Sequence, residues 1–212
     1  MGRSRTKLAS LTSSARPLLA ALTCVFITYY SCVKGLAARE AYPTDSVSEQ
    51  QTLADAKRVN EGNHRYGIVA YTHYPNGPSY MLLPSLALGT ETTRDLRAVP
   101  VVFAAICFGI FSLGLVLHLS SVLFYPLSLL ALYCLISQPG VVYWMGALHQ
   151  QAYGLGLCFA GMGLALISAT PNFAFALLGF IAGWMGYDMI PCFVFSLFTC
   201  RLLTYAREPL SS

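Results

Sequence analysis

The sequence predicts an all-α polytopic membrane protein of about five transmembrane helices, with a small α+β insert between the first helix and the second. Three observations predict this class. Between Ala98 and Cys200 the only formally charged residue is Asp188. Apolar residues make up 56% of the chain and charged residues 10%, against about 25% charged residues in ordinary globular domains. A polar segment, residues 39–97, separates this apolar half from an earlier apolar stretch.

The apolar half, residues 98–205, cannot form an ordinary soluble core, because a surface helix needs a polar face toward water. In a bilayer the same composition is favourable, and about 20 apolar residues make one crossing. We therefore expect a four-helix membrane bundle in this half. Its second helix either ends at Gln138-Pro139-Gly140 or kinks there, since membrane helices tolerate Pro. Its last segment, residues 173–205, is either one tilted helix or a helix broken at Gly186–Pro191.

The N-terminal region has a basic, Ser/Thr-rich tail at residues 1–16 and an apolar segment at 17–38. A retained signal-anchor helix with a cytosolic N-terminus is favoured by the positive flank. A cleaved signal peptide and a mitochondrial presequence are the alternatives. The expected location is accordingly a multi-pass protein of a secretory-pathway membrane or endomembrane, with the mitochondrial inner membrane as the alternative. Residues 206–212 form a short C-terminal tail.

The polar insert, residues 39–97, carries most of the acidic and basic side chains. Ser46-Val47-Ser48-Glu49 has the pattern of a capping box, and Gly62 provides a stop, so a short helix is expected between them. Tyr66–Tyr74 and Ser79–Leu83 flank a Pro- and Gly-rich turn and predict a two-stranded hairpin. Such a hairpin is marginal alone, so the insert is expected to lean on the bundle, a partner or the headgroup layer.

No catalytic residue, cofactor site or metal site is predicted. The sequence contains no nucleophile elbow, phosphate loop, zinc pattern or twin-cysteine motif. Nucleic acid is not an expected partner, because thirteen Lys and Arg give a net charge of +4 but nowhere form a dense run. One helix, a long polar loop and further helices resemble the layout of claudin-type tetraspan proteins. Residues 39–97 lack the Trp motif and Cys pair of that family's loop, so no family is assigned.

One possible intramembrane polar site comprises Asp188, His149 and Gln150. A carboxylate in hydrocarbon costs roughly 2.5–3.5 kcal/mol on insertion scales and usually faces the bundle interior or a watery path. If Asp188 lies at mid-depth, it predicts a small transporter or ion-coupled carrier. An interfacial turn or a structural hydrogen bond is favoured instead, because no buried Lys or Arg is expected to pair with it.

Glycines give the clearest signal for helix packing. Small residues four apart let membrane helices approach closely, and two neighbouring segments carry them. The expected helix-packing residues are Gly154, Gly161, Gly179, Gly183 and Gly186. With the lipid bilayer and other membrane subunits as expected partners, these features predict a non-catalytic scaffold or accessory subunit of a membrane complex. The carrier that uses Asp188 is the alternative.

Overall fold

The chain is helical throughout the part that this computed structural model describes, residues 2–41, 47–62, 77–90, 92–119, 124–167, 172–185 and 189–205. No residue in these ranges belongs to a β-strand. The helices are α1 (Gly2–Ala41), α2 (Val47–Asn60), α3 (Gly77–Ala87), α4 (Thr93–Leu96), α5 (Ala98–His118), α6 (Tyr125–Ile136), α7 (Pro139–Gly146), α8 (Gln150–Leu166), α9 (Asn172–Met185) and α10 (Met189–Tyr205).

Within the described ranges, two helical segments are long and apolar enough to cross a membrane. They are Ala15–Arg39 within α1 and Thr93–His118, which joins α4 to α5. Helices α6 and α7 pass the same test only as a pair bent by 62°. The prediction of five crossings is therefore not supported. Helices α8, α9 and α10 are apolar but have 17, 14 and 17 residues, fewer than the roughly 20 that a bilayer requires.

The last apolar segment, residues 173–205, forms two helices, which agrees with the expectation of a broken helix and not with that of one tilted helix. Helix α9 ends at Met185 and α10 begins at Met189. The second bundle helix bends sharply where Gln138 precedes Pro139, because a residue before Pro avoids the helical region and Gln138 has φ −62° and ψ 128°. Both breaks fall where the sequence offered one, at Gln138-Pro139-Gly140 and within Gly186–Pro191, although the sequence left open whether each helix would continue.

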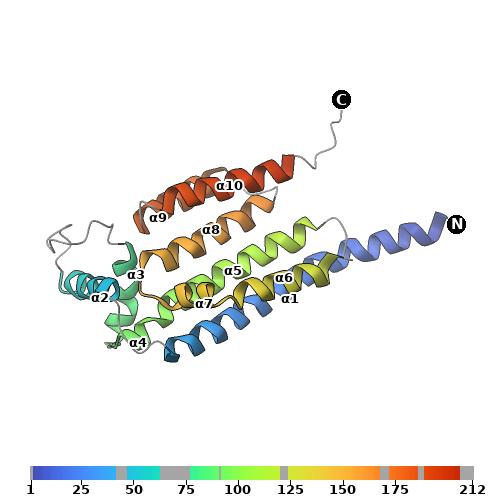
Figure 1. The fold of residues 1–212 in the computed structure, drawn as a ribbon. Coiled ribbons are helices and arrows are strands. Elements are labelled where there is room, and N and C mark those ends of the chain that lie inside the picture. Colours follow the sequence, from blue (N-terminus) through green and yellow to red (C-terminus); the bar gives the residue numbers. More distant parts are fainter. Residues whose placement is uncertain are drawn as a thin grey trace.

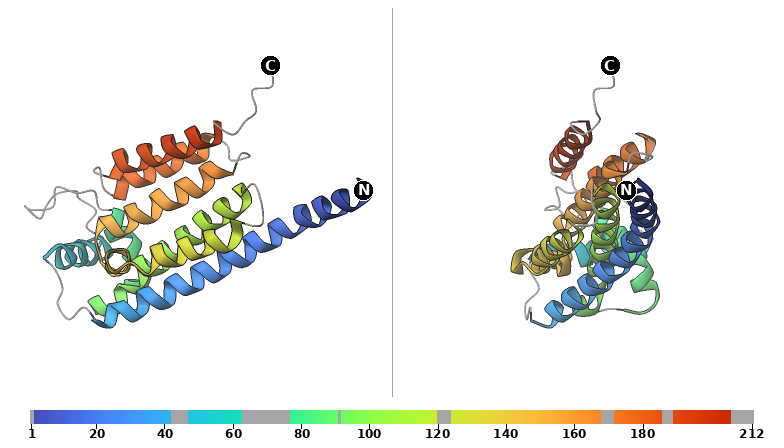
Figure 2. Two further views of the ribbon diagram at one scale, coloured as in Figure 1. Left: turned by 45° about the vertical axis from the view of Figure 1, so that its right-hand side comes forward. Right: turned by 90° about the vertical axis from the view of Figure 1, so that its right-hand side faces the viewer.

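Helix α5 lies at the centre of the bundle (Figures 1 and 2). Helix α1 packs along one side of α5 and α8 along another, while α9 and α10 pack on α8. One apolar cluster joins α1, α5, α6 and α7 around Ile27, Phe108 and Met145. A second cluster joins α8, α9 and α10 around Tyr153, Met185 and Phe193. The chain thus builds outward from α5 on both sides.

Helices α5 and α8 cross with their backbones in direct contact. A Cβ atom placed on Gly114 would lie 2.8 Å from the Cα atom of Gly163. A Cβ atom on Gly163 would lie 2.6 Å from the Cα atom of Phe111. Only glycine fits at such a crossing, which matches the small-residue packing of membrane helices. Gly114 and Gly163 are therefore the positions on which this approach depends.

Helix α1 is an integral part of the bundle. Ala20 and Ile27 are completely buried. The side chain of Thr28 occupies the space that a Cβ atom on Gly109 of α5 would fill. The hydroxyls of Thr23 and Tyr125 share a hydrogen bond of 2.8 Å, and those of Tyr30 and Ser137 share one of 2.9 Å. Each bond joins α1 to α6 or to the residue that follows α6.

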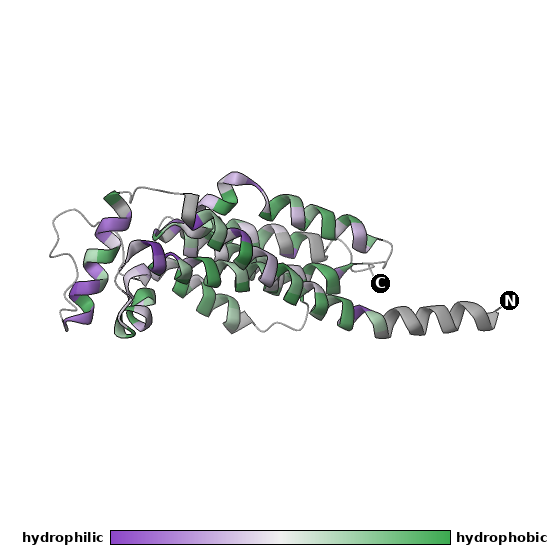
Figure 3. Ribbon diagram, turned by 90° about the horizontal axis from the view of Figure 1, so that it is seen from below, coloured by the Kyte–Doolittle hydropathy of each residue, from purple (hydrophilic) through white to green (hydrophobic). Residues whose placement is uncertain are grey.

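The polar insert is a small helical unit, which we call the polar cap: α2, α3 and α4. It lies at one end of the bundle, opposite the end at which α10 finishes (Figure 1), and hydrophilic residues gather on α2 there (Figure 3). The prediction of an α+β insert was wrong for Ser79–Leu83, which lies within helix α3. Pro78 fits the first turn of a helix, where its fixed φ and missing N–H are favourable. The other predicted strand, Tyr66–Tyr74, lies outside the described residues.

Two of the three cap helices, α2 and α3, are followed by a glycine with positive φ. Gly62 follows α2 with φ 87°, as its place in the sequence predicts, and Gly89 follows α3 with φ 81°. After α3, Thr90 donates to the carbonyl of Ser85 and Gly89 to that of Leu86, the Schellman arrangement. The capping residue predicted at the start of α2, Ser46, lies outside the described residues.

The α5–α8 crossing can be tested with the substitution Gly163→Ala. The added methyl group meets backbone on both Ile110 and Phe111, which cannot rotate away, so we expect a loss of about 1–3 kcal/mol in the free energy of unfolding. Gly140→Ala is the matched control, because its Cβ would have nothing within 4 Å and Ala favours a helix. Unfolding of each variant in detergent gives the comparison; equal stability of the two would contradict the crossing.

Candidate functional site: the polar cap and its clamp on the bundle

A buried ion pair fastens the polar cap to the bundle. Arg97 donates from Nε to Oε1 of Glu49 at 3.0 Å and from Nη2 to Oε2 at 2.8 Å. The geometry is bidentate, with each guanidinium nitrogen on its own carboxylate oxygen, which is the strong form of this pair. Both residues are only 4% exposed. Glu49 lies in the first turn of α2, and Arg97 lies between α4 and α5.

The same carboxylate holds a third segment. The backbone N–H of Leu148 donates to Oε1 of Glu49 at 3.0 Å, and Leu148 belongs to the short connection from α7 to α8. One acidic side chain thus joins the cap to the N-terminus of α5 and to the N-terminus of α8. Carboxylates are also favoured near helix N-termini, because the backbone N–H groups there are positive. We call Glu49, Arg97 and Leu148 the clamp.

Sequence reasoning assigned Glu49 to a capping box and did not pair it with Arg97. The carboxylate is bound by Arg97 and by the N–H of Leu148, and the capping partner Ser46 lies outside the described residues. A signal was present, because Arg97 is the last charged residue before the long apolar run and an unpaired charge there would be costly to bury. The partner could not be chosen from sequence, since several acids in residues 39–97 were equally available.

Beneath the clamp the cap has its own apolar core. The fully buried residues are Ala56 of α2, Leu82 of α3, Leu96 of α4 and Leu148. The hydroxyl of Ser79 donates to the carbonyl of Thr52 at 3.3 Å, which ties α3 to α2. The clamp therefore lies beside a small hydrophobic core that unites all three cap helices with the bundle.

A second contact fixes α3 against α9. A Cβ atom on Gly77 would lie 3.0 Å from the Cα atom of Met185, so the two helix ends touch through their backbones. The rings of Tyr80 and Trp184 lie 5.4 Å apart beside this contact. Trp184 is partly exposed, as is Trp144 of α7. Tyr and Trp at one end of a bundle are typical of a membrane–water interface.

The predicted polar site is only partly described. Asp188 and the side chain of Gln150 lie outside the described residues, so their expected proximity is untested. His149 caps the N-terminus of α8: its Nδ1 accepts from the N–H of Gln151 at 3.5 Å, and its ring lies 6.1 Å from that of Trp144. Met185, the last described residue before Asp188, touches α3 at the cap end of the bundle.

The predicted packing glycines lie mostly at contacts among α8, α9 and α10. The ring of Phe193 in α10 lies between two of them, with Cε2 2.7 Å from a Cβ on Gly161 and Cε1 3.4 Å from one on Gly179. A Cβ on Gly183 would lie 3.1 Å from Cδ1 of Ile190. Gly154 is buried within α8, and Gly186 lies outside the described residues. The backbone contacts at Gly114 and Gly163 involve two further glycines; Gly163 lies on α8, one of the two glycine-rich segments that the sequence singled out, whereas Gly114 was not predicted.

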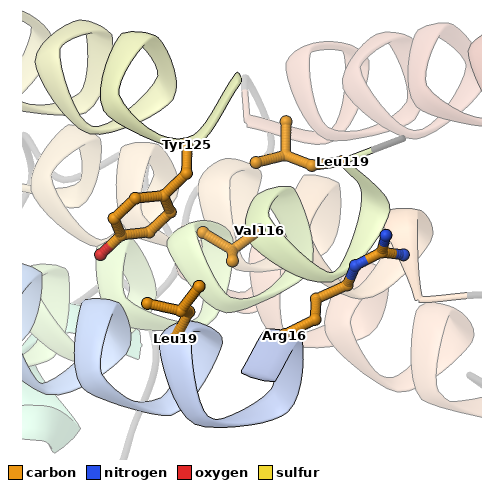
Figure 4. A pocket seen from close by; sticks show the side chains of 5 residues that line it. All are labelled: Arg16, Leu19, Val116, Leu119 and Tyr125. Atoms are coloured by element: carbon orange, nitrogen blue, oxygen red, sulfur yellow. The ribbon is translucent and has the colours of Figure 1, made fainter. Parts of the chain in front are cut away.

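Apolar grooves and a small cavity open on the described part of the bundle. The α3–α5 groove encloses about 430 Å³ and the α7–α8–α10 groove about 320 Å³. At the far end, Arg16, Leu19, Val116, Leu119 and Tyr125 line a cavity of about 10 Å³ (Figure 4). A space of that size holds one water molecule at most. Within the described ranges, no three His, Cys, Asp or Glu side chains are grouped closely enough to hold a metal ion.

The geometry defines a helical bundle with a clamped polar cap, in which two of the described helical segments are long and apolar enough to cross a membrane. No family model, curated protein or solved structure matches the chain. The class of protein is accordingly given by the apolar helices and the cap, and its function rests on the site alone.

The clamp can be tested by a double-mutant cycle. Arg97→Met leaves the Glu49 carboxylate buried without its guanidinium, so we expect a loss of about 3–5 kcal/mol in the free energy of unfolding. Glu49→Gln strands Arg97 in the same way but keeps an acceptor for Leu148. The double variant should cost less than the sum of the two, because no charge is then left buried.

Arg94→Met serves as the control for the cycle, because Arg94 is exposed and its loss should change stability by less than about 1 kcal/mol. Unfolding is measured in one detergent at low and high salt. The effects of Arg97→Met and Glu49→Gln should persist at high salt, since buried pairs are weakly screened. Strict additivity of the two substitutions would show that the side chains are not coupled.

A pH dependence is expected from Asp55 in α2. Burial raises the pKa of its carboxyl, and Arg58, which donates to Oδ1 at 2.7 Å, opposes the rise. A raised pKa means that this group's contribution to stability is complete below the ordinary aspartate pKa of about 3.9 and is lost as the pH rises through the raised value. Asp55→Asn should flatten this part of the stability–pH curve, measured by unfolding in detergent, and a curve identical to that of wild type would contradict the expectation.

Proposed function

We propose that the chain is a non-catalytic multi-pass membrane protein that acts as a scaffold or accessory subunit of a membrane complex. One observation carries the proposal: the polar cap is fixed to the bundle by the clamp, by its own apolar core and by the contact of Gly77 with α9. A polar unit held at three places keeps one orientation at the membrane surface. Such a unit is suited to present a docking face to another subunit.

The outer face of α2 is the docking face that we propose. Gln50, Ala54, Lys57 and Glu61 recur every three or four residues and are all exposed, whereas Glu49, Asp55, Ala56 and Val59 face inward and are buried. The helix therefore shows a polar stripe to water and commits its other side to the bundle. Both signs of charge on the stripe favour a polar protein partner.

The outer faces of the bundle helices supply the contacts with lipid and with membrane subunits. Exposed large apolar side chains occur on every bundle helix except α8, among them Val25, Phe26, Leu130, Phe180 and Phe195. In water such a surface would be unstable, because monomeric soluble proteins rarely expose contiguous apolar patches of this kind. In a bilayer it is the expected lipid-facing surface.

Helix α1 supports the retained signal-anchor among the three interpretations of the N-terminal region. Ala20, Ile27 and Thr23 are buried against the rest of the bundle, so removal of residues 1–38 would open its core. We therefore propose a membrane of the secretory pathway or endomembrane system, with the N-terminus cytosolic. The mitochondrial inner membrane is the alternative location.

The carrier alternative receives less support. The charged pair buried in the described residues, Glu49 and Arg97, is fully engaged in a bidentate structural contact. Met185, the last residue of α9, touches the cap, so the end of α9 lies beside the polar cap. A carboxylate there would meet water or headgroups.

The proposal is tested by the substitution Ala54→Arg in the exposed stripe of α2. A long cationic side chain at the centre of the stripe should displace a docked subunit, and the complex extracted in mild detergent should run at a smaller size on a native gel. Ala87→Arg, at an exposed position of α3, is the matched control and should leave the size unchanged. If wild type and Ala54→Arg migrate alike, the α2 stripe is not the docking face.

Asp188→Asn separates the scaffold from the carrier. The amide retains polarity and hydrogen-bonding capacity, so a turn or structural residue should tolerate it, and the variant should rescue a deletion strain. Its abundance and native-gel size should match those of wild type. A variant of normal abundance and assembly that fails to rescue would overturn the scaffold proposal in favour of a carrier.

A further inference from the structure

The α3–α5 groove lies where α5 leaves the polar cap and enters the apolar half of the chain. Met81, Pro84 and Ser85 of α3 form one wall, and Ala98, Val99, Val102, Phe103 and Ile106 of α5 form the other. Its volume of about 430 Å³ is within the range of about 300–1,000 Å³ typical of small-molecule sites. Val102 is 43% exposed and Ile106 51% exposed, so the groove is open on its outer side.

A cationic residue, Arg94, precedes this wall of the groove by one helical turn. Thr93–His118 behaves as one apolar helical segment of 26 residues, so side chains four positions apart lie on the same face. Arg94, Ala98, Val102 and Ile106 follow this spacing. Arg94 is exposed and lies at the water end of the stripe, and the three groove residues follow toward the apolar end.

We infer that the α3–α5 groove binds one phospholipid of the surrounding bilayer, with an acyl chain against Val102 and Ile106 and the phosphate on Arg94. The inference rests on the membrane placement of the proposed function but not on the scaffold role. The order of groups along the stripe, a cation followed by apolar side chains, matches the order of phosphate and acyl chain in a phospholipid. Arg is also the side chain that binds phosphate in bidentate geometry.

The shape of the groove favours an acyl chain over a membrane helix of another subunit. A helix with its side chains is about 10–12 Å across and would have to run along α5 toward the cap. There Met81, Pro84 and Ser85 of α3 form the facing wall. A single acyl chain is narrower, is flexible and ends below the headgroup, so it can occupy the groove without passing α3.

The test uses vesicles of phosphatidylcholine and phosphatidylglycerol in equal parts, from which the purified full chain is released and weighed by native mass spectrometry. We expect wild type to retain one phospholipid. Val102→Trp should abolish the adduct, because the indole fills the groove. Arg94→Gln should lower the retained fraction by roughly tenfold, the loss of one charge-assisted contact to phosphate. Arg94→Lys should retain an intermediate fraction, since it keeps the charge without the bidentate geometry.

Matched controls keep the result specific. Val25→Trp places the same side chain on α1 at a position that is 69% exposed and lines neither groove, and Lys57→Gln removes an exposed cation of the cap on α2. Both should retain the lipid as wild type does. The site is overturned if wild type carries no adduct or if Val25→Trp loses as much lipid as Val102→Trp. It is also overturned if the adduct that Val102→Trp loses is a copurified polypeptide and not a phospholipid. Native-gel size should stay unchanged in every lipid-site variant, which distinguishes this result from failure of the scaffold proposal.

Discussion

The buried ion pair between Glu49 and Arg97 is the constraint on which the arrangement of this protein depends. Two charges are withdrawn from water at the end of an apolar bundle, which is tolerable only because each is satisfied by the other and Leu148 supplies a further donor. The pair joins α2, the root of α5 and the start of α8. Moving the cap in any direction would strand a charge, so the pair sets orientation more than it adds stability.

Packing in the apolar part follows a different rule. Membrane helices gain little from a hydrophobic drive, because lipid tails are as apolar as their side chains. Close backbone approach replaces it here, at Gly114 and Gly163 between α5 and α8 and at Gly77 between α3 and α9. The bundle and the cap are therefore connected by two kinds of contact that cannot slide, glycine against backbone and guanidinium against carboxylate. This explains how a small polar unit can be held in place at a membrane surface.

The candidate site was only partly predictable for physical reasons. The glycine signal correctly directed attention to helix packing, but the tightest crossing pairs Gly163 with Gly114 of a helix 49 positions away in sequence, and spacing within one segment cannot identify such a partner. Glu49 had two possible uses, as a local cap and as a distant counter-ion. The pairing with Arg97, 48 positions away in sequence, could not be predicted, because only the fold brings the two side chains together.

The sequence by itself determined the helical, apolar character of the chain, its polar cap between two long apolar segments, and the stop at Gly62. These follow from composition and local pattern, which act over a few residues. The tertiary structure decided the number of long apolar helices, the break between α9 and α10 and the helical form of Ser79–Leu83. The physical reason is that Leu82 is needed in the core of the cap, and burial there outweighs the strand preference of its neighbours.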